Sequence, residues 1–190
     1  MASTDFISKY KWPLIALVIV LIIIGGIVGM YNSFVTLDQD VKGKWSEVEN
    51  QYQRQADLIP NLNTTLNRYM QFEKSTLMEI TQLRSQWQAA STDLEKDTVG
   101  MQMTSSLGRL IATFEAYPDL KTIQTVNSLM DELSGTQNRL ATARGRYITS
   151  IQAFNTAIQQ FPGVLFARMF GFIGREYYHA ASDALVTPHI

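Results

Sequence analysis

Three charged side chains, Arg54, Asp57 and Glu73, have the types and the spacing from which a polar site could be built. Arg54 and Asp57 lie three residues apart, a spacing that allows two side chains to pair on one face of a helix. Glu73 falls in register with the apolar residues around it, so we expect its carboxylate at or near the core, where it needs a cationic partner. Arg54, Arg139 or Arg144 could be that partner. We interpret the three residues as a structural ion-pair cluster that fixes helix register, and we keep a ligand or peptide site as the alternative.

The sequence contains no arrangement typical of catalysis or metal binding. Its two histidines, His179 and His189, belong to neither a Glu-x-x-His nor a His-Glu-x-x-His motif. The chain has no cysteine, which excludes thiolate nucleophiles, disulfides and cysteine-ligated zinc. It also lacks a Gly-rich phosphate loop and a Gly-x-Ser-x-Gly elbow. We therefore expect a protein that is not an enzyme, with no catalytic residue, no cofactor and no metal.

The charge of the chain bears on its partners. The formal net charge is -1 over 190 residues. A nucleic-acid-binding protein needs an excess of Lys and Arg on one surface to pair with phosphate. Nucleic acid is therefore not an expected partner.

Residues 12–31 are apolar enough to form a transmembrane helix, which a short tail at residues 1–11 precedes. No charged residue occurs between Trp12 and Leu37, and the stretch from Leu14 to Val28 is nearly continuous Leu, Ile and Val. About 18 helical residues span roughly 27 Å, close to the hydrocarbon thickness of a bilayer. A buried core helix is rarely so apolar over this length, and a cleaved signal peptide has an apolar region of only ~7–15 residues. We expect an anchor that is retained, which makes the lipid bilayer a partner.

The anchor also bears on membrane orientation and on self-association. Two lysines precede the span and two follow it, so the positive-inside count is equal on the two sides. The acidic Asp38 and Asp40 after the span tilt the expectation toward a cytoplasmic N-terminus and an extracytoplasmic bundle. Gly25 and Gly29 have the small-xxx-small spacing that lets two membrane helices approach closely. We expect a single-pass cell-membrane protein that forms homo-oligomers.

Residues 32–162 repeat apolar side chains at three- and four-residue steps, which is the pattern of helices with one buried face. The expected fold is all-α, with the transmembrane helix followed by an antiparallel up-and-down bundle of three to four long helices. One apolar run ends at Ile59 and a second extends from Leu62 to Trp87. Pro60, between them, either begins a second helix or kinks one long helix. The stretch from Gln88 to Gly100 is expected to be the longest connection.

A different composition, rich in aromatic residues and glycine, begins after Pro162 and covers residues 163–190. One interpretation is a segment that folds back onto the bundle. The other is a contact with a partner or with the membrane surface, because so much aromatic area is costly to leave in water. The residues assigned to a candidate oligomer interface, together with Gly25 and Gly29, are Phe166, Phe170, Phe172 and Tyr177.

Several landmarks between Tyr31 and about Tyr178 carry a family resemblance. The most specific is residues 53–62, Gln-Arg-Gln-Ala-Asp-Leu-Ile-Pro-Asn-Leu. Further landmarks are Glu73, Arg84, Tyr117-Pro118, Gly135-Thr136, Asn138-Arg139, Ala143-Arg144, Tyr147, Asn155, Phe161-Pro162 and Phe170-Gly171-Phe172. This set resembles the LemA family, whose pattern looks like Q-R-R-x-D-L-I-P-N-L; Gln55 departs from it, since the family has a second Arg there. The resemblance implies an N-terminal anchor followed by a helical bundle, in a family whose molecular function is unsettled.

Together these features predict a membrane-anchored, non-enzymatic helical bundle that self-associates as an envelope scaffold. The alternative is an accessory or regulatory subunit of a membrane protease or of another envelope enzyme, in which case an envelope protein is the partner. Co-purification separates the two, because a scaffold is recovered mainly with itself and an accessory subunit with one stoichiometric partner.

Overall fold

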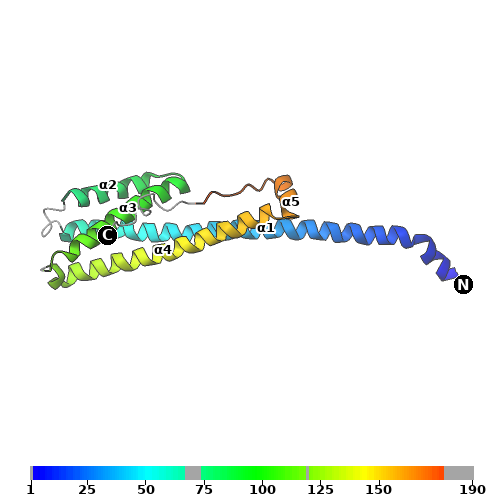
Figure 1. Cartoon of the computed structure of the whole chain (residues 1–190), viewed down its shortest axis with the longest axis horizontal. Helices are drawn as coiled ribbons and strands as arrows, with labels where there is room; N and C mark the ends of the chain where they lie inside the picture. The colour runs from blue at the N-terminus through cyan, green and yellow to red at the C-terminus, as the bar shows by residue number, and fades with distance from the viewer. Residues whose placement is uncertain (1, 67–73, 119, 178–190) are drawn as a thin grey trace, which may run out of the picture. The chain divides into compact units, whose positions relative to one another are not determined.

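The computed structural model describes residues 2–66, 74–118 and 120–177, with side chains from residue 10 onward. The helical segments are α1 (Ala2–Leu66), α2 (Lys74–Ala89), α3 (Asp93–Glu115), the 3-10 helix η2 (Leu120–Thr122), α4 (Gln124–Gln159) and α5 (Gly163–Phe170) (Figure 1). No strand occurs in these described ranges, which confirms the all-α class. The chain divides into two compact units: the first contains Met1–Lys42 and Thr149–Tyr177, and the second contains Gly43–Ile148.

Contacts between helices give the direction of each helix of the second unit relative to α1. They are Asn63–Thr81 and Ala56–Arg84 between α1 and α2, Tyr52–Asp97 and Gln55–Thr104 between α1 and α3, and Trp45–Tyr147 and Arg54–Glu132 between α1 and α4. By these contacts α3 runs parallel to α1, whereas α2 and α4 run antiparallel to it. The antiparallel α2 and α3 lie side by side (Figure 1). The second unit is therefore an up-and-down four-helix bundle, as predicted.

The core of the bundle is built on one stripe of α1. Its members are Val41, Trp45, Val48, Tyr52, Ala56, Ile59, Leu62 and Leu66, each no more than 5% exposed. Their three- and four-residue spacing keeps them on one face of a helix. The apolar run before Pro60 and the start of the run after it therefore form a single stripe on α1. Leu62 and Leu66 continue α1, whereas Leu77, Ile80, Leu83 and Trp87 belong to the antiparallel α2, and Tyr69 lies outside the described residues.

Pro60 lies inside α1 and does not begin a new helix. Proline has no N–H, so residue 60 cannot donate the usual helical hydrogen bond to the carbonyl of Ala56, four residues earlier. Ala56 is fully buried, which would leave this carbonyl without water. The side chain of Arg84 on α2 replaces the missing donor, with its Nε 2.9 Å from the Ala56 oxygen. A proline within the helix is therefore tolerated because a neighbouring helix supplies the hydrogen bond.

The prediction that Gln88 to Gly100 is the longest connection is wrong. α2 continues to Ala89 and α3 begins at Asp93, so three residues connect them. Thr92 caps α3: the Glu95 N–H donates to its hydroxyl, and the Glu95 carboxylate accepts from the Thr92 N–H. This reciprocal capping box is a signal for the start of a helix that the polar composition of the stretch concealed. Gly100, read as the end of a loop, lies in the middle of α3.

The apolar stretch near the N-terminus and the first helix of the bundle are one continuous helix. Within the described residues, one helix is long and apolar enough to cross a membrane, and none of its most apolar 18-residue window is buried. From Leu14 to Ile24 its Leu, Ile and Val side chains are between 48% (Val18) and 68% (Ile22) exposed, whereas Ile27 is half-buried. The predicted anchor at residues 12–31 is therefore part of α1, and the first buried residue of this helix from residue 10 onward is Phe34, at 3% exposure.

In the first unit, the segment after Pro162 folds back onto α1 and α4. α5 ends at Gly171, whose positive φ of 76° turns the chain sharply, a conformation that favours glycine. The ring of Phe172 then packs edge-on against Phe34 at 5.4 Å and against Phe154 at 6.3 Å. Phe172 thus packs against both α1 and α4 within the first unit.

A polar clasp fixes the end of this segment. The side chain of Asn155 on α4 accepts from the Arg175 N–H at 2.8 Å and donates to the Arg175 carbonyl at 2.7 Å. The Arg175 guanidinium also donates to Asp38 at 2.6 Å, and Lys42 pairs with the other oxygen of Asp38 at 2.7 Å. Burial alone would raise the pKa of the Asp38 carboxyl, but hydrogen bonds from Arg175 and Lys42 hold it below its ordinary value.

The role of Arg84 leads to a double-mutant prediction. Arg84→Met is expected to lower the free energy of unfolding by about 1–3 kcal/mol, because the buried Ala56 carbonyl loses its donor. In a Pro60→Ala background the same replacement is expected to cost less, since residue 60 regains an N–H. Urea unfolding of the full chain in detergent, followed by circular dichroism, would measure all four variants. An equal cost of Arg84→Met in both backgrounds would contradict the assigned role.

Candidate functional site

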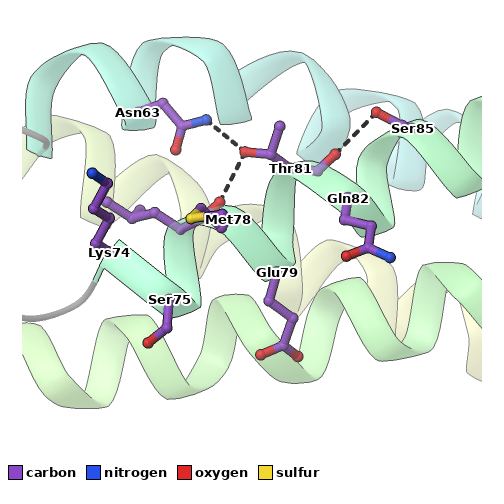
Figure 2. A pocket seen from close by; sticks show the side chains of 9 residues that line it. Asn63, Lys74, Ser75, Met78, Glu79, Thr81, Gln82 and Ser85 are labelled. Carbon is purple, nitrogen blue, oxygen red and sulfur yellow. Dashed lines mark hydrogen bonds between the residues drawn. The ribbon is translucent and has the colours of Figure 1, made fainter.

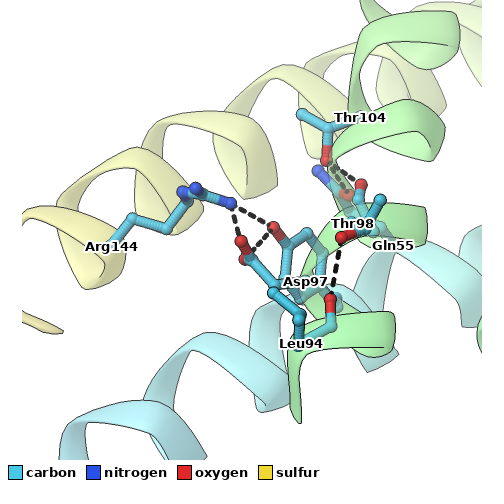
Figure 3. Close-up of polar contacts among 8 residues, drawn as sticks. Gln55, Leu94, Asp97, Thr98, Thr104 and Arg144 are labelled. Atoms are coloured by element: carbon cyan, nitrogen blue, oxygen red, sulfur yellow. Dashed lines mark hydrogen bonds and ion pairs between the residues drawn. The ribbon is translucent and has the colours of Figure 1, made fainter. Parts of the chain in front are cut away.

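The most deeply buried charged group of the described bundle is a triad formed by Tyr52, Asp97 and Arg144. The Tyr52 hydroxyl donates to Asp97 Oδ1 at 2.9 Å, and Arg144 Nη1 donates to the same oxygen at 2.7 Å and to the Tyr52 oxygen at 2.5 Å. Figure 3 shows the Arg144 guanidinium extending from α4 toward the Asp97 carboxylate on α3. Tyr52 comes from α1, so the triad joins three helices. The side chains of Asp97 and Arg144 are only 5% and 16% exposed.

Local packing explains how an aromatic ring fits among these helices. Gly100, one turn after Asp97, faces the Tyr52 ring so closely that a Cβ atom there would lie 2.6 Å from Tyr52 Cε1. The Tyr52 ring also meets the ring of Trp87 of α2, at 6.4 Å between centroids. Lys96 then extends over Trp87 and pairs with Glu49. Glycine is thus needed at position 100 because the Tyr52 ring occupies the space of a side chain.

The electrostatics of the triad follow from its burial. Burial raises the pKa of the Asp97 carboxyl, and the Arg144 guanidinium and Tyr52 hydroxyl oppose that shift without cancelling it. Burial, together with the neighbouring Asp97 charge, raises the pKa of Tyr52 above its ordinary value, so the phenol stays neutral and acts as a donor. A carboxyl whose pKa is raised by folding costs stability as the pH rises through that pKa. Ionisation of the Asp97 carboxyl is therefore less favourable in the folded chain than in water.

A second polar contact lies two turns farther along α3. The Thr104 hydroxyl donates to Gln55 Oε1 at 2.9 Å, and Gln137 Nε2 donates to the Thr104 carbonyl at 3.1 Å (Figure 3 shows the first of these). Gln55 is fully buried, and its Nε2 has no hydrogen-bond partner among the described residues. Polar groups that can be satisfied in one alignment disfavour other registers of packed helices. The arrangement is suited to fixing helix alignment, because the hydroxyl and the carbonyl of Thr104 are each bonded to a glutamine from another helix.

The predicted cluster of Arg54, Asp57 and Glu73 is placed only in part. Arg54 forms an exposed ion pair with Glu132 of α4 at 2.9 Å. Asp57, also exposed, accepts from Gln53 at 2.7 Å. Glu73 lies outside the described residues, and so do both histidines. The structure thus brings Arg54 to α4 and does not pair it with Asp57.

The triad was not predicted from the sequence, although a signal for one of its members, Asp97, was present. Gly100 and Asp97 extend the apolar register of Met103, Leu107 and Leu110 backward by one turn and two turns, respectively. The prediction of a loop from Gln88 to Gly100 assigned these two positions to no helix, so their register was not considered. Arg144 was considered, but as a partner for Glu73.

An open groove of about 700 Å³ lies between the end of α1 and α2. Figure 2 shows its centre, where Asn63 donates to the Thr81 hydroxyl and Ser85 donates to the Thr81 carbonyl. Its lining residues are Asn63, Lys74, Ser75, Leu77, Met78, Glu79, Thr81, Gln82 and Ser85. Glu79 is paired with Arg109. In the described part of the chain, no group of three or more His, Asp or Glu side chains is placed to hold a metal ion.

The buried triad yields a stability prediction. Asp97→Ala is expected to cost about 3–5 kcal/mol, because Arg144 would remain buried without a counter-charge. Replacing all three members, by Tyr52→Phe, Asp97→Leu and Arg144→Met, is expected to be far milder or neutral, since apolar groups of similar volume remove the desolvation cost. Thermal unfolding of the full chain in detergent would compare the variants. If Asp97→Ala leaves the stability unchanged, the carboxylate is solvated and the triad has no structural role.

Comparisons with known proteins identify the family. The magnetosome protein MamQ of Magnetospirillum gryphiswaldense is 25% identical over 189 aligned residues, which cover 84% of this chain and 70% of the relative. Magnetosome protein MamQ 1 of Paramagnetospirillum magneticum is 24% identical with the same coverage. Protein LemA of Metamycoplasma hominis is 26% identical over 137 residues, or 70% of this chain and 62% of the relative. None of these names states a reaction. The LemA family model matches residues 44–190, about three quarters of the chain, and the protein therefore belongs to the LemA family.

Proposed function

We propose that this protein is a single-pass membrane scaffold: the N-terminal part of α1 crosses the bilayer, and the helical bundle associates with other copies without catalysing a reaction. The observation that carries the membrane part is the contrast along α1. Between Leu14 and Ile24 the helix is apolar on all sides and exposed, whereas from Phe34 onward it buries one stripe. A helix that is apolar all round needs an apolar solvent.

Energetics and flanking residues support the span. Each central Leu, Ile or Val contributes about -0.3 to -0.6 kcal/mol to insertion, and roughly a dozen of them outweigh the three glycines. Trp12 and Tyr31 stand at the two ends of the apolar stretch, where interfacial aromatic side chains are favoured. Lys11 lies 5.9 Å from the Trp12 ring and gives that end a charge suited to the headgroups.

The non-enzymatic part of the proposal is supported by the site geometry. Asp97, the buried charged residue of the described bundle, is paired with Arg144 and with Tyr52. Such closed pairing leaves neither a free base nor a nucleophile facing a substrate. The names of the relatives state no reaction either.

The first test concerns the anchor. The protein is expected to stay in membrane pellets after high-salt and carbonate washing, because the exposed apolar stretch cannot be solvated by water. N-terminal sequencing of the pelleted protein is expected to find the start of the chain intact. A mature protein that begins near Tyr31 would show instead that the stretch is a removed signal.

The second test concerns self-association. The double change Gly25→Ile with Gly29→Ile is expected to weaken a homo-oligomer in mild detergent, because the bulky side chains keep two anchors apart. A Cβ at either position meets nothing within 4 Å in the chain itself, so the fold should be unaffected. Gly26→Ile is the control, since Gly26 is equally open but lies about 60° around the helix from Gly29 and about 100° from Gly25. Mass measurement reports the result.

Two outcomes would contradict the scaffold. A wild-type protein that is monomeric at all concentrations lacks the expected self-contact. A wild-type monomer that is recovered with one stoichiometric envelope protein would support the accessory-subunit alternative instead.

A further inference from the structure

α5 is a helix of 8 residues in which Arg168 is the one charged side chain. The inner face is in contact with the protein, since Ala167 is 2% exposed and Phe170 packs on Tyr31. On the outer face, Leu165 and Met169 are one turn apart and are 61% and 64% exposed. A surface helix of a soluble protein carries mainly polar residues on its outer face. Apart from Arg168, the exposed face of α5 therefore lacks the composition expected of a surface in water.

The turns that flank α5 expose two further large apolar side chains. Phe161 precedes α5 and Ile173 follows it, and each is 82% exposed. Phe161, Leu165, Met169 and Ile173 are thus spaced by four residues along the chain. We call these four residues the outer patch. Such a cluster of large apolar side chains marks a contact surface more often than a freely solvated one.

The position of α5 along α1 indicates the solvent that the outer patch meets. The ring of Tyr31 on α1 lies 5.1 Å from that of Phe170 and 6.0 Å from that of Phe172. Tyr31 comes directly after the all-round apolar part of α1, which ends near Val28. All these residues belong to the same compact unit, so their relative placement is defined. α5 therefore lies beside the end of the proposed membrane span.

Charged residues define the other limit of this zone. Asp38, with its partners Lys42 and Arg175, lies seven residues after Tyr31 on the same helix, or about 10 Å farther from the span. Such a set of charges belongs on the water side of the headgroups. The outer patch thus lies between the end of the hydrocarbon-length stretch and the first charged cluster. Arg168, exposed on α5, is the basic residue of this zone and suits lipid phosphate.

We propose that α5 is a second membrane contact, in which Leu165, Met169 and Ile173 dip into the headgroup region of the bilayer beside the end of the anchor. The inference rests on the proposed membrane span of α1 and adds to it a surface that would fix how the first unit meets the lipid. Interfacial helices bind through an apolar face buried about 5–10 Å into the headgroup and acyl boundary. The contact is preorganised, because Phe172 and the Asn155–Arg175 clasp hold the segment before it meets lipid.

The absence of cysteine makes a site-specific test clean. Single-cysteine variants Leu165→Cys and Met169→Cys of the full chain would be labelled with an environment-sensitive fluorophore and reconstituted in phosphatidylcholine vesicles. Gln152→Cys is the matched control, because Gln152 is exposed on α4 in the same unit. Val20→Cys reports on the span itself. Quenching by spin-labelled lipids, with the label near the headgroup or deep in the chain, is compared with quenching by aqueous iodide.

Shallow-labelled lipid is expected to quench the probes at 165 and 169 severalfold more strongly than the probe at 152, while deep-labelled lipid quenches the probe at 20 best. Two results would overturn the inference and leave the anchor intact, provided the Val20 probe is still quenched by lipid. In the first, the probes at 165 and 169 are quenched by iodide as strongly as the probe at 152. In the second, they are shielded from both iodide and lipid, so that protein covers the patch, either a second copy or another segment of the chain. A Val20 probe that lipid does not quench would instead overturn the membrane span.

Discussion

The apolar stripe of α1 is the surface on which the other long helices of this protein pack. In the bundle unit, α2, α3 and α4 each contact it, through Trp87, Asp97 and Tyr147 respectively. In the other unit, the aromatic segment after α5 contacts the same helix at Tyr31 and Phe34. Burying a large aliphatic or aromatic side chain contributes about 1.5–3 kcal/mol, and the stripe holds many of them. If α1 lost its one-sided pattern, neither unit would have a core.

Within this apolar frame, a few polar groups restrict how the helices can align. The Ala56 carbonyl receives no hydrogen bond from Pro60, so it needs Arg84 of α2 as its donor. The Asp97 carboxylate requires both Tyr52 and Arg144. Each of these groups is costly when it is buried without a partner, so a shifted helix would lose more than contact area. We infer that the polar contacts specify the alignment while the apolar contacts supply the stability.

The same helix supports the proposed function. α1 changes from apolar on all sides to apolar on one side between Val28 and Phe34, and this change marks where a membrane would end and a protein core begin. The aromatic rings of Tyr31, Phe170 and Phe172 gather at this point. Aromatic side chains are favoured at membrane interfaces as well as in protein cores, so this zone suits both environments.

The sequence by itself determined the helical class, the apolar stretch and the up-and-down order of helices, because these depend on local periodicity that each segment carries alone. It also pointed to residues 53–62 and Arg84 as family landmarks without a reason for them. Only the tertiary structure decided that Pro60 lies within a helix, since the donor that makes this possible comes from Arg84, 24 positions away on another helix. The start of α3 at Asp93 had a local signal in Thr92 and Glu95, but the burial of Asp97 and Gly100 depended on Tyr52 and Arg144. A charged residue and a glycine resemble a loop until the ring and the cation that they contact are placed beside them, and those contacts join segments that lie far apart in the chain.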